Sequence, residues 1–156
     1  MRGQPGYEKL KQYQERGFVF HGSTRDGLEV LQPHKPRDAG DDPWNKDEAV
    51  YATTNPALAI PFALRQGYTG VFTVTTDTDT GEVTATFNAV FRDVLASNRG
   101  YVYVFDGALF PERKGLQGKS YQEVIPVDVV EVTLEDFVAL GGHIVFVQHK
   151  HPSGAD

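Results

Sequence analysis

Short segments rich in aromatic and β-branched residues recur along this 156-residue chain, and only brief helical patterns separate them. The segments typical of β-strands are residues 18–21, 49–53, 70–76, 81–87, 101–105, 121–132 and 143–148. Two of them, "GVFTVTT" and "GEVTATF", flank the turn "DTDTG" and predict a β-hairpin. No strand–helix–strand rhythm repeats, so the pattern predicts an α+β fold with antiparallel sheets rather than a doubly wound parallel sheet.

Helical patterns are expected over residues 7–16, 55–66 and 88–97, followed by one helical turn after Thr133. Residues placed to begin or end these helices are Gly17, Asn55, Pro56, Asn88 and the pair Thr133 and Asp136. Pro61 lies inside the second pattern, where it should kink or break a regular helix at a cost of about 3 kcal/mol. Residues 32–48, with three prolines, and residues 110–120, which are charged, are expected to be loops.

Length and composition predict one domain over residues 1–156, with a loose tail from about residue 149. Hydrophobic residues make up 40% of the chain, which is ordinary for a folded protein. The net charge of −6 argues against general affinity for nucleic acid, and the absence of cysteine excludes disulfides. We find no signal peptide and no apolar run of membrane-spanning length, so we expect a soluble, cytoplasmic protein with no membrane partner.

Three polar residues lie in or beside strand patterns where an apolar residue would be expected: His21, Tyr51 and Glu123. A histidine at the end of a strand can be a structural residue, and a strand tyrosine can belong to the core. Glu123 is the least ordinary of the three, because an unpaired buried carboxylate costs several kcal/mol. It must therefore be solvated at an edge strand, paired, or used chemically.

The segments around these residues resemble ADP-ribosyltransferases. "FHGST" resembles the His-Gly-Ser/Thr motif that opens their catalytic domain, and "VYATTNPALAIPFA" resembles the strand and helix that follow. "YQEVIPVD" is similar to the strand that carries their catalytic glutamate. In this order the three elements resemble the His-Tyr-Glu branch, that of diphtheria toxin and the poly(ADP-ribose) polymerases. The resemblance covers about residues 17–132 and implies split antiparallel sheets around an NAD cleft.

The chemistry of that family breaks the bond between nicotinamide and its ribose in NAD, through a transition state with oxocarbenium character. The resemblance implies that the catalytic residues are Glu123, His21 and Tyr51. Glu123 would stabilise the charge on the ribose or accept a proton from the nucleophile. His21 would contact the adenosine ribose, and Tyr51 would stack on nicotinamide.

Further NAD contacts are implied at Gly22, whose backbone would take the carboxamide, and at the Ser23 or Thr24 hydroxyl. Phe62 matches the place of a second stacking aromatic, although it can equally be helix core. The chain departs from the family at Ala59, near the position where polymerase-like members have a serine. This departure predicts weaker NAD binding.

Charged residues near the motifs form a second set of candidates. Arg25, Lys35 and Arg37 could meet the NAD pyrophosphate, or be ordinary surface charges. The acceptor loop would contain Lys119 and Tyr121, preceded by two further basic residues at positions 113 and 114. Tyr121 stands where arginine-modifying toxins carry Gln or Glu, so an arginine acceptor is disfavoured. We expect no metal, because the spacing of His143, His149 and His151 does not suit ligands.

The function expected from the sequence is therefore mono-ADP-ribosylation, with NAD as substrate and an unidentified acceptor that is a protein, a nucleic acid or a small molecule. Two alternatives stay open. One is an NAD-dependent RNA 2'-phosphotransferase, against which the acidic charge balance counts. The other is a catalytically silent ADP-ribosyltransferase-like binding domain, which the alanine at position 59 favours.

Overall fold

The computed structural model describes residues 5–34, 47–68, 70, 72–77 and 79–148 of the chain. Within these residues the larger of two sheets has six strands in the order β6-β7-β2-β1-β5-β8, and all neighbours are antiparallel. Its strands are β1 (Val19–Ser23), β2 (Val50–Thr53), β5 (Gly100–Phe105), β6 (Glu112–Lys114), β7 (Gln117–Ser120) and β8 (Asp128–Val132).

The smaller sheet has the order β3-β4-β9 in the described part of the chain. Its strands are β3 (Phe72–Thr76), β4 (Val83–Asn88) and β9 (His143–Val147). The predicted hairpin is confirmed, since β3 and β4 are antiparallel neighbours. The side chain of Asp77 accepts the backbone N–H groups of Asp79 and Thr80 in its turn, at 2.8 and 3.0 Å.

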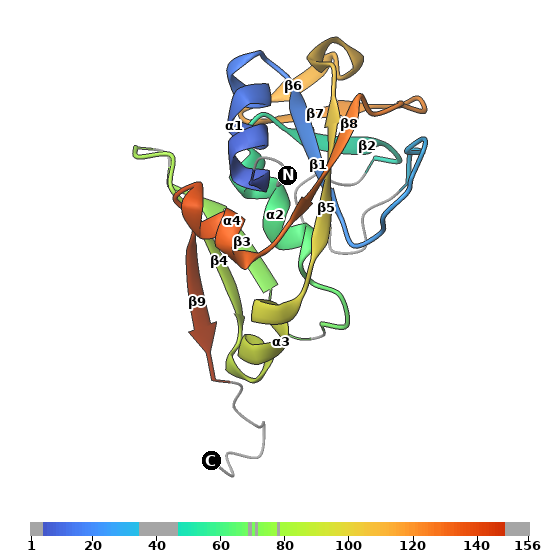
Figure 1. Ribbon diagram of the computed structural model, residues 1–156. Helices are drawn as coiled ribbons and strands as arrows, with labels where there is room; N and C mark the ends of the chain where they lie inside the picture. Colours follow the sequence, from blue (N-terminus) through green and yellow to red (C-terminus); the bar gives the residue numbers. More distant parts are fainter. Residues whose placement is uncertain (1–4, 35–46, 69, 71, 78, 149–156) are drawn as a thin grey trace.

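Four short helices and two 3₁₀ turns complete the described fold. They are α1 (Gly6–Glu15), α2 (Pro56–Ala63), α3 (Arg92–Ser97), α4 (Leu134–Ala139), η2 (Ala89–Phe91) and η3 (Gly107–Leu109). Figure 1 shows α1 and α2 beside the larger sheet, α4 next to α2, and the smaller sheet below them. The α+β class with two sheets agrees with the prediction from the sequence.

The main core joins both sheets around α2. Ile60 of α2 is fully buried in a cluster that contains Phe20 of β1 and Phe87 of β4. A smaller cluster packs on the other face of the larger sheet, around Tyr103 and Phe105 of β5. The sheet that carries the candidate site is therefore covered on both faces.

Helix α2 lies unusually close to the larger sheet because two strand positions are glycine. A Cβ atom on Gly22 would stand 2.0 Å from the carbonyl oxygen of Ala59, and one on Gly100 would stand 2.1 Å from that of Ala63. Ala59 and Ala63 are four residues apart, so they present one small-residue face to β1 and β5. The two glycines and two alanines set the depth at which α2 packs.

Several local expectations were wrong. Residues 110–120 are not simply a loop, because the positive φ of Gly115 allows a tight hairpin between β6 and β7. The segment 121–127 is not a regular strand; within it Val124 forms an isolated bridge to Leu31. The sheets are not all antiparallel, since β4 and β9 run parallel, joined by a long crossover.

The helix signals had mixed outcomes. Thr133 and Asp136 form the expected cap, in which the Asp136 carboxylate accepts the Thr133 N–H at 2.9 Å. Asn55 caps α2 through the N–H of Ala57 at 3.0 Å. Pro61 is buried inside α2 and does not break it, since the helix continues to Ala63. Asn88 precedes η2 but makes no side-chain capping hydrogen bond.

The close approach of α2 predicts that Gly22→Ala destabilises the fold by about 3 kcal/mol or more, since backbone must move to admit the methyl group. Chemical denaturation measures this cost. Gly27→Ala is the control: Gly27 has φ +75° and open space around its Cβ position, so only backbone strain of about 1 kcal/mol is expected. Equal costs for the two variants would contradict the packing argument.

Candidate functional site

The candidate site lies where β1 and β2 separate. Among the described residues the two strands share one register pair, Phe20 with Thr53, whereas β1 pairs with β5 along its whole length. Beyond that pair the imidazole of His21 bridges the strands, and its Nδ1 lies 2.7 Å from the backbone oxygen of Tyr51. The structure therefore brings together two of the three residues that the sequence singled out.

The hydrogen bond of His21 fixes its tautomer. A carbonyl oxygen only accepts, so Nδ1 carries the proton and Nε2 of the neutral ring is left as an acceptor. Desolvation by burial lowers the pKa of His21 below 6.5, the nearby His34 lowers it further, and the bond to Tyr51 opposes both. Because the pKa is lowered, His21 is neutral at pH 7.

The side chains of His21 and Tyr51 leave their strands toward opposite faces of the sheet. His21 is paired with Tyr103, which belongs to the smaller core cluster together with Val50 and Ala52. Tyr51 lies between these last two residues in β2, so its ring points the other way. The contact between His21 and Tyr51 is therefore side chain to backbone.

The ring of Tyr51 belongs to a polar cluster with Lys119, Tyr121 and Asp47. The Lys119 ammonium lies 2.7 Å from Asp47 Oδ2 and 5.7 Å from the centroid of each tyrosine ring. Tyr121 donates its hydroxyl to the same Oδ2 at 2.8 Å, and Tyr51 donates its hydroxyl to the Asp47 backbone oxygen at 2.9 Å. Asp47 therefore ties the two predicted acceptor-loop residues to Tyr51.

The charges of this cluster shift the pKa values of its members. Hydrogen bonds from Lys119 and Tyr121 lower the pKa of the Asp47 carboxyl. Hydrogen bonding to the carboxylates of Glu112 and Asp47 raises the pKa of Tyr121. Desolvation raises the pKa of Tyr51. Both tyrosines are consequently neutral hydrogen-bond donors at physiological pH, beside an ion pair.

The turn after β1 is held by a residue that the sequence analysis did not single out, Tyr103. Its hydroxyl donates to the backbone oxygen of Arg25 at 2.6 Å and accepts the N–H of Leu28 at 3.1 Å. The Ser23 hydroxyl accepts the Arg25 N–H at 3.1 Å, while Thr24 is partly exposed and the Arg25 side chain extends to the surface. Ser23 thus has a structural role in the turn.

Glu123 is exposed and lies in the irregular segment between β7 and β8. Within the described part of the chain no hydrogen bond or ion pair joins its carboxylate to His21 or Tyr51. It precedes Val124, whose backbone N–H and C=O bond to Leu31 at 3.0 and 2.9 Å. Its predicted placement on a strand was wrong, and its side chain is exposed to solvent.

Phe62 lies on the outer side of α2 and is 42% exposed. Its ring packs edge-on against Phe72 of β3 at 5.2 Å, and the Arg65 guanidinium lies 5.3 Å from its centroid. It is therefore not helix core. Ala59, by contrast, is buried, and its backbone carbonyl occupies the space where a Cβ atom on Gly22 would stand.

The other candidates have varied placements. Arg113 donates to the backbone oxygens of Phe110 and Gly107 at 2.7 and 2.8 Å and so holds a turn, whereas Lys114 is exposed. Lys35, Arg37, His149 and His151 lie outside the described residues. Among those that are described, no group of three or more His, Cys, Asp or Glu could hold a metal ion.

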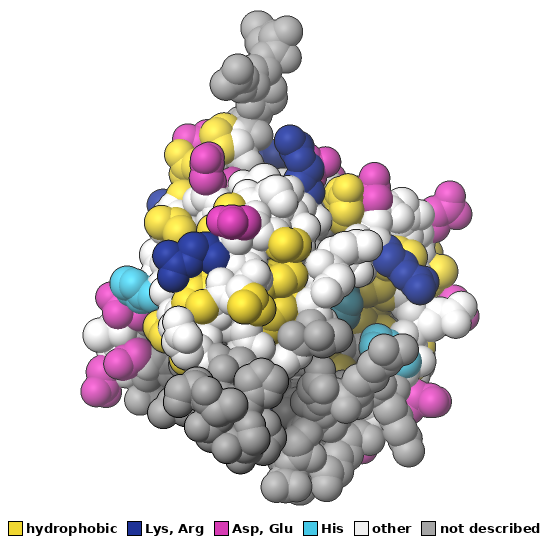
Figure 2. Space-filling view, turned by 90° about the horizontal axis from the view of Figure 1, so that it is seen from below, with side chains coloured by type: hydrophobic (Ala, Val, Ile, Leu, Met, Phe, Trp, Pro, Cys, Tyr) yellow, Lys and Arg dark blue, Asp and Glu magenta, His cyan; other side chains and the backbone are white. Residues whose placement is uncertain are grey.

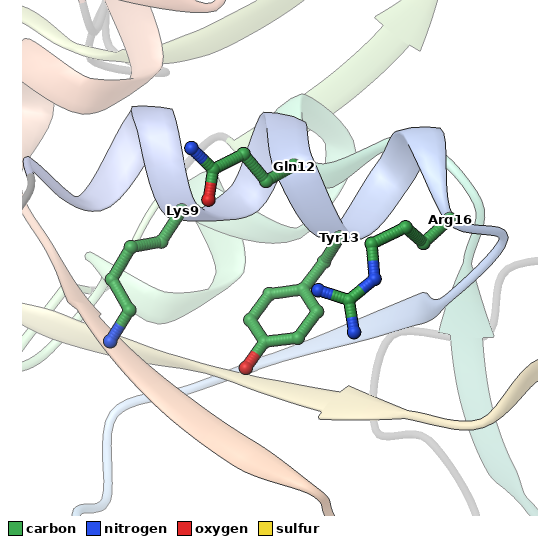
Figure 3. Close-up of a pocket in the computed structure, with 4 residues that line it drawn as sticks. All are labelled: Lys9, Gln12, Tyr13 and Arg16. Carbon is green, nitrogen blue, oxygen red and sulfur yellow. The ribbon is translucent and has the colours of Figure 1, made fainter.

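A shallow hollow on α1 is lined by two cations and two polar residues, Lys9, Gln12, Tyr13 and Arg16 (Figure 3). The Tyr13 hydroxyl donates to Asp128 at 2.6 Å, and Lys9 is 3.7 Å from the same carboxylate oxygen. The Arg16 guanidinium lies over the rings of Tyr13 and Phe18. The contacts of Tyr13 and Lys9 with Asp128 fasten α1 to β8, and none of these contacts involves the predicted site residues.

The surface is mixed in charge. On the face seen in Figure 2, basic side chains stand apart from one another among acidic and apolar ones. Among the described residues no helix is long and apolar enough to span a membrane.

Two residues of the site region were missed by the sequence analysis. Tyr103 lies in "YVYVF", where a polar ring inside a buried strand was the available signal. Asp47 lies among several acidic residues at the end of a proline-rich stretch, and nothing in the sequence distinguishes it from them.

Comparisons with protein-family models, with curated proteins and with solved structures find no significant match to this chain.

The lowered pKa of His21 predicts a pH-dependent stability. Between its folded pKa and 6.5 the unfolded chain binds more protons than the folded one, so the free energy of unfolding rises with pH in that window. Stability is lost as the pH falls below 6.5, and urea denaturation at pH 5 to 7.5 measures the slope.

His21→Asn should flatten that slope, because the Asn amide can still donate to Tyr51 but does not titrate there. His143→Asn, which alters an exposed histidine beside Glu82, should leave the slope in place. A His21→Asn profile as steep as that of the wild type would show that another group carries the pH dependence.

Proposed function

We propose that this protein is a mono-ADP-ribosyltransferase, which cleaves NAD between nicotinamide and ribose and transfers ADP-ribose to an acceptor. The observation that carries the proposal is the hydrogen bond of the His21 ring to the Tyr51 backbone oxygen where β1 and β2 separate; the Tyr51 ring itself points to the opposite face of the sheet. The segments "FHGST" and "VYATTNP" resemble the NAD-binding motifs of that superfamily, and this contact makes them spatial neighbours.

The neutral His21 ring supports a role in ribose recognition. With Nδ1 committed to Tyr51, Nε2 is a fixed acceptor that suits a ribose hydroxyl. Tyr51 supplies an aromatic face for a nicotinamide ring, and its hydroxyl is held by Asp47, so the ring is oriented before a ligand arrives. Preorganisation of this kind reduces the entropy lost on binding.

Glu123 supplies the carboxylate in this proposal. Its side chain is exposed, so a substrate can reach it, and it follows β7, the strand that pairs with the Tyr51 strand. In the reaction the carboxylate stabilises the positive charge that develops on the ribose. The segment around it also presents Tyr121 and Ile125 to solvent, which gives the acceptor side an aromatic and apolar character.

Glu123→Gln should lower nicotinamide release from NAD by at least about a hundredfold, because the amide removes a charge from the transition state. Release is measured by chromatography with purified protein and NAD, with and without cell extract as acceptor source. Glu131→Gln is the matched control, since Glu131 is an exposed glutamate of β8 paired with Arg99. Full activity of the Glu123→Gln variant would refute the proposal.

Tyr51→Ala should raise the KM for NAD about tenfold through loss of the stacking surface, whereas Tyr51→Phe, which keeps the ring, should change it little. Steady-state kinetics measures both. If Tyr51→Ala keeps the wild-type KM, the nicotinamide ring does not stack on Tyr51.

A second candidate function is a catalytically silent binding domain that resembles an ADP-ribosyltransferase. The alanine at position 59 favours it, since its methyl side chain offers no hydroxyl to a carboxamide. Calorimetry distinguishes the two functions: heat of NAD binding without any nicotinamide release supports the silent domain.

A further inference from the structure

The outer strands of the two sheets differ in charge. In the larger sheet one outer strand, β6, consists of three exposed charged residues, Glu112–Lys114. The other, β8, carries Asp128, whose carboxylate binds Tyr13 of α1. Charged side chains on an edge strand prevent it from pairing with a further strand. In the smaller sheet β9 has the sequence "HIVFV" and contains no Asp, Glu, Lys or Arg, so it lacks this protection.

Strand β9 is an edge of its sheet. Within the part of the chain that the structure describes its one neighbouring strand is β4, and Figure 1 shows it on the outside of the smaller sheet. An edge strand presents a row of backbone N–H and C=O groups that can pair with another strand. The backbone of β9 is therefore a template for one more strand.

The side chains of β9 leave part of the hydrophobic core uncovered at this edge. Ala85 and Phe87 of β4 are fully buried, whereas their register partners in β9, Ile144 and Phe146, pack against the same core and are only partly buried. On the opposite face of the strand Val145 is 43% exposed. Both faces of β9 thus present apolar surface that a further strand would remove from water.

The other edge strand of the smaller sheet, β3, is less suited to such pairing. Its most exposed side chains, Thr73 and Thr75, are polar. The ring of its Phe72 is already in contact with the Arg65 guanidinium, which lies 4.5 Å from the ring centroid. Strand β9 is therefore the apolar edge of this sheet.

The sequence of β9 is complementary to itself when two copies run antiparallel about Val145. In that register Ile144 lies opposite Phe146 of the second copy, and the two-fold axis repeats this pair. Pairs of an aromatic and a β-branched residue are favourable across antiparallel strands. Val145 lies opposite Val145 of the second copy, and His143 lies opposite Val147, so no two residues of like charge meet.

We propose that β9 is a homodimer interface, at which two copies of this chain pair antiparallel about Val145 and join their three-stranded sheets into one. The inference is independent of the proposed function, because His21 and Tyr51 lie in the larger sheet. The contact depends on one strand of five residues and is smaller than a standard interface. The dimer is therefore weak, with an expected dissociation constant of about 100 µM.

Analytical ultracentrifugation of the full chain tests this pairing at concentrations from about one tenth to about ten times that value. The average mass should rise from the 17.3 kDa of one chain toward the mass of two. Val145→Lys should weaken the dimer at least about tenfold, because two ammonium groups would face each other at the axis. Val138→Lys is the matched control, since Val138 is a 57% exposed valine of α4 outside the strand.

Cross-linking tests the register and does not need the lysine variant to fold. The chain has no cysteine, so a single introduced thiol reports on one position. A short bismaleimide linker should join two Val145→Cys chains, because cross-strand Cβ atoms at the axis lie about 5 Å apart. His143→Cys is the register control: the two positions would lie four residues apart along the strands, about 13 Å, and should be joined far more slowly.

Three results would overturn the proposal. An average mass of one chain at every concentration would leave the edge to a strand of another protein. Dimerisation of Val145→Lys as strong as that of the wild type would place the interface on another surface. A mass that grows beyond two chains would contradict closed two-fold pairing, which ends at the dimer.

Discussion

The close contact between α2 and the larger sheet is the constraint on which the rest of the structure depends. With Gly22 in β1 and Gly100 in β5, the helix backbone can approach to a distance that no side chain would allow. This depth lets α2 reach both sheets, so that one core contains Phe20 from the larger sheet and Phe87 from the smaller. It also places Gly22, the residue after His21 in β1, directly against α2, the helix that follows the Tyr51 strand.

The packing of α2 explains why Gly22, the glycine of "FHGST", is needed even without a ligand. A glycine in a ligand-binding motif is commonly explained by close approach of the ligand backbone or ring. Here the space of a Cβ on Gly22 is already filled by Ala59. The polar part of the site is instead organised by neighbouring segments: His21 donates to the Tyr51 carbonyl, and the Tyr51 hydroxyl donates to the Asp47 backbone oxygen.

The elements with strong local signals were predictable from the sequence. The hairpin around "DTDTG" and the cap formed by Thr133 and Asp136 both depend on residues close together in the chain, and both are present. The parallel pairing of β4 with β9 was not predictable, because it joins segments more than fifty residues apart and no short-range pattern encodes it. Of the two outcomes predicted for Pro61, a break is contradicted, because α2 continues through it to Ala63; propensity gives the cost of a proline in a helix but not whether the tertiary structure tolerates it.

The candidate site was predictable only in part. His21 and Tyr51 stood out because polar side chains interrupted apolar strands, and they do meet. The side chains of His21 and Tyr51 point to opposite faces of the sheet because of the strand register. Glu123 is exposed because residues 121–127 follow an irregular path. Residue types alone reveal neither feature. The roles of these residues in NAD chemistry remain predictions.

The most direct test of the central claim is a titration of the ¹⁵N-labelled protein with NAD, followed by two-dimensional NMR of the backbone amides. The account predicts that the amides of His21, Gly22 and Tyr51 shift together and saturate with one dissociation constant. Saturable shifts confined to α1, around the hollow of Lys9 and Arg16, or no saturable shift at millimolar NAD, would contradict it.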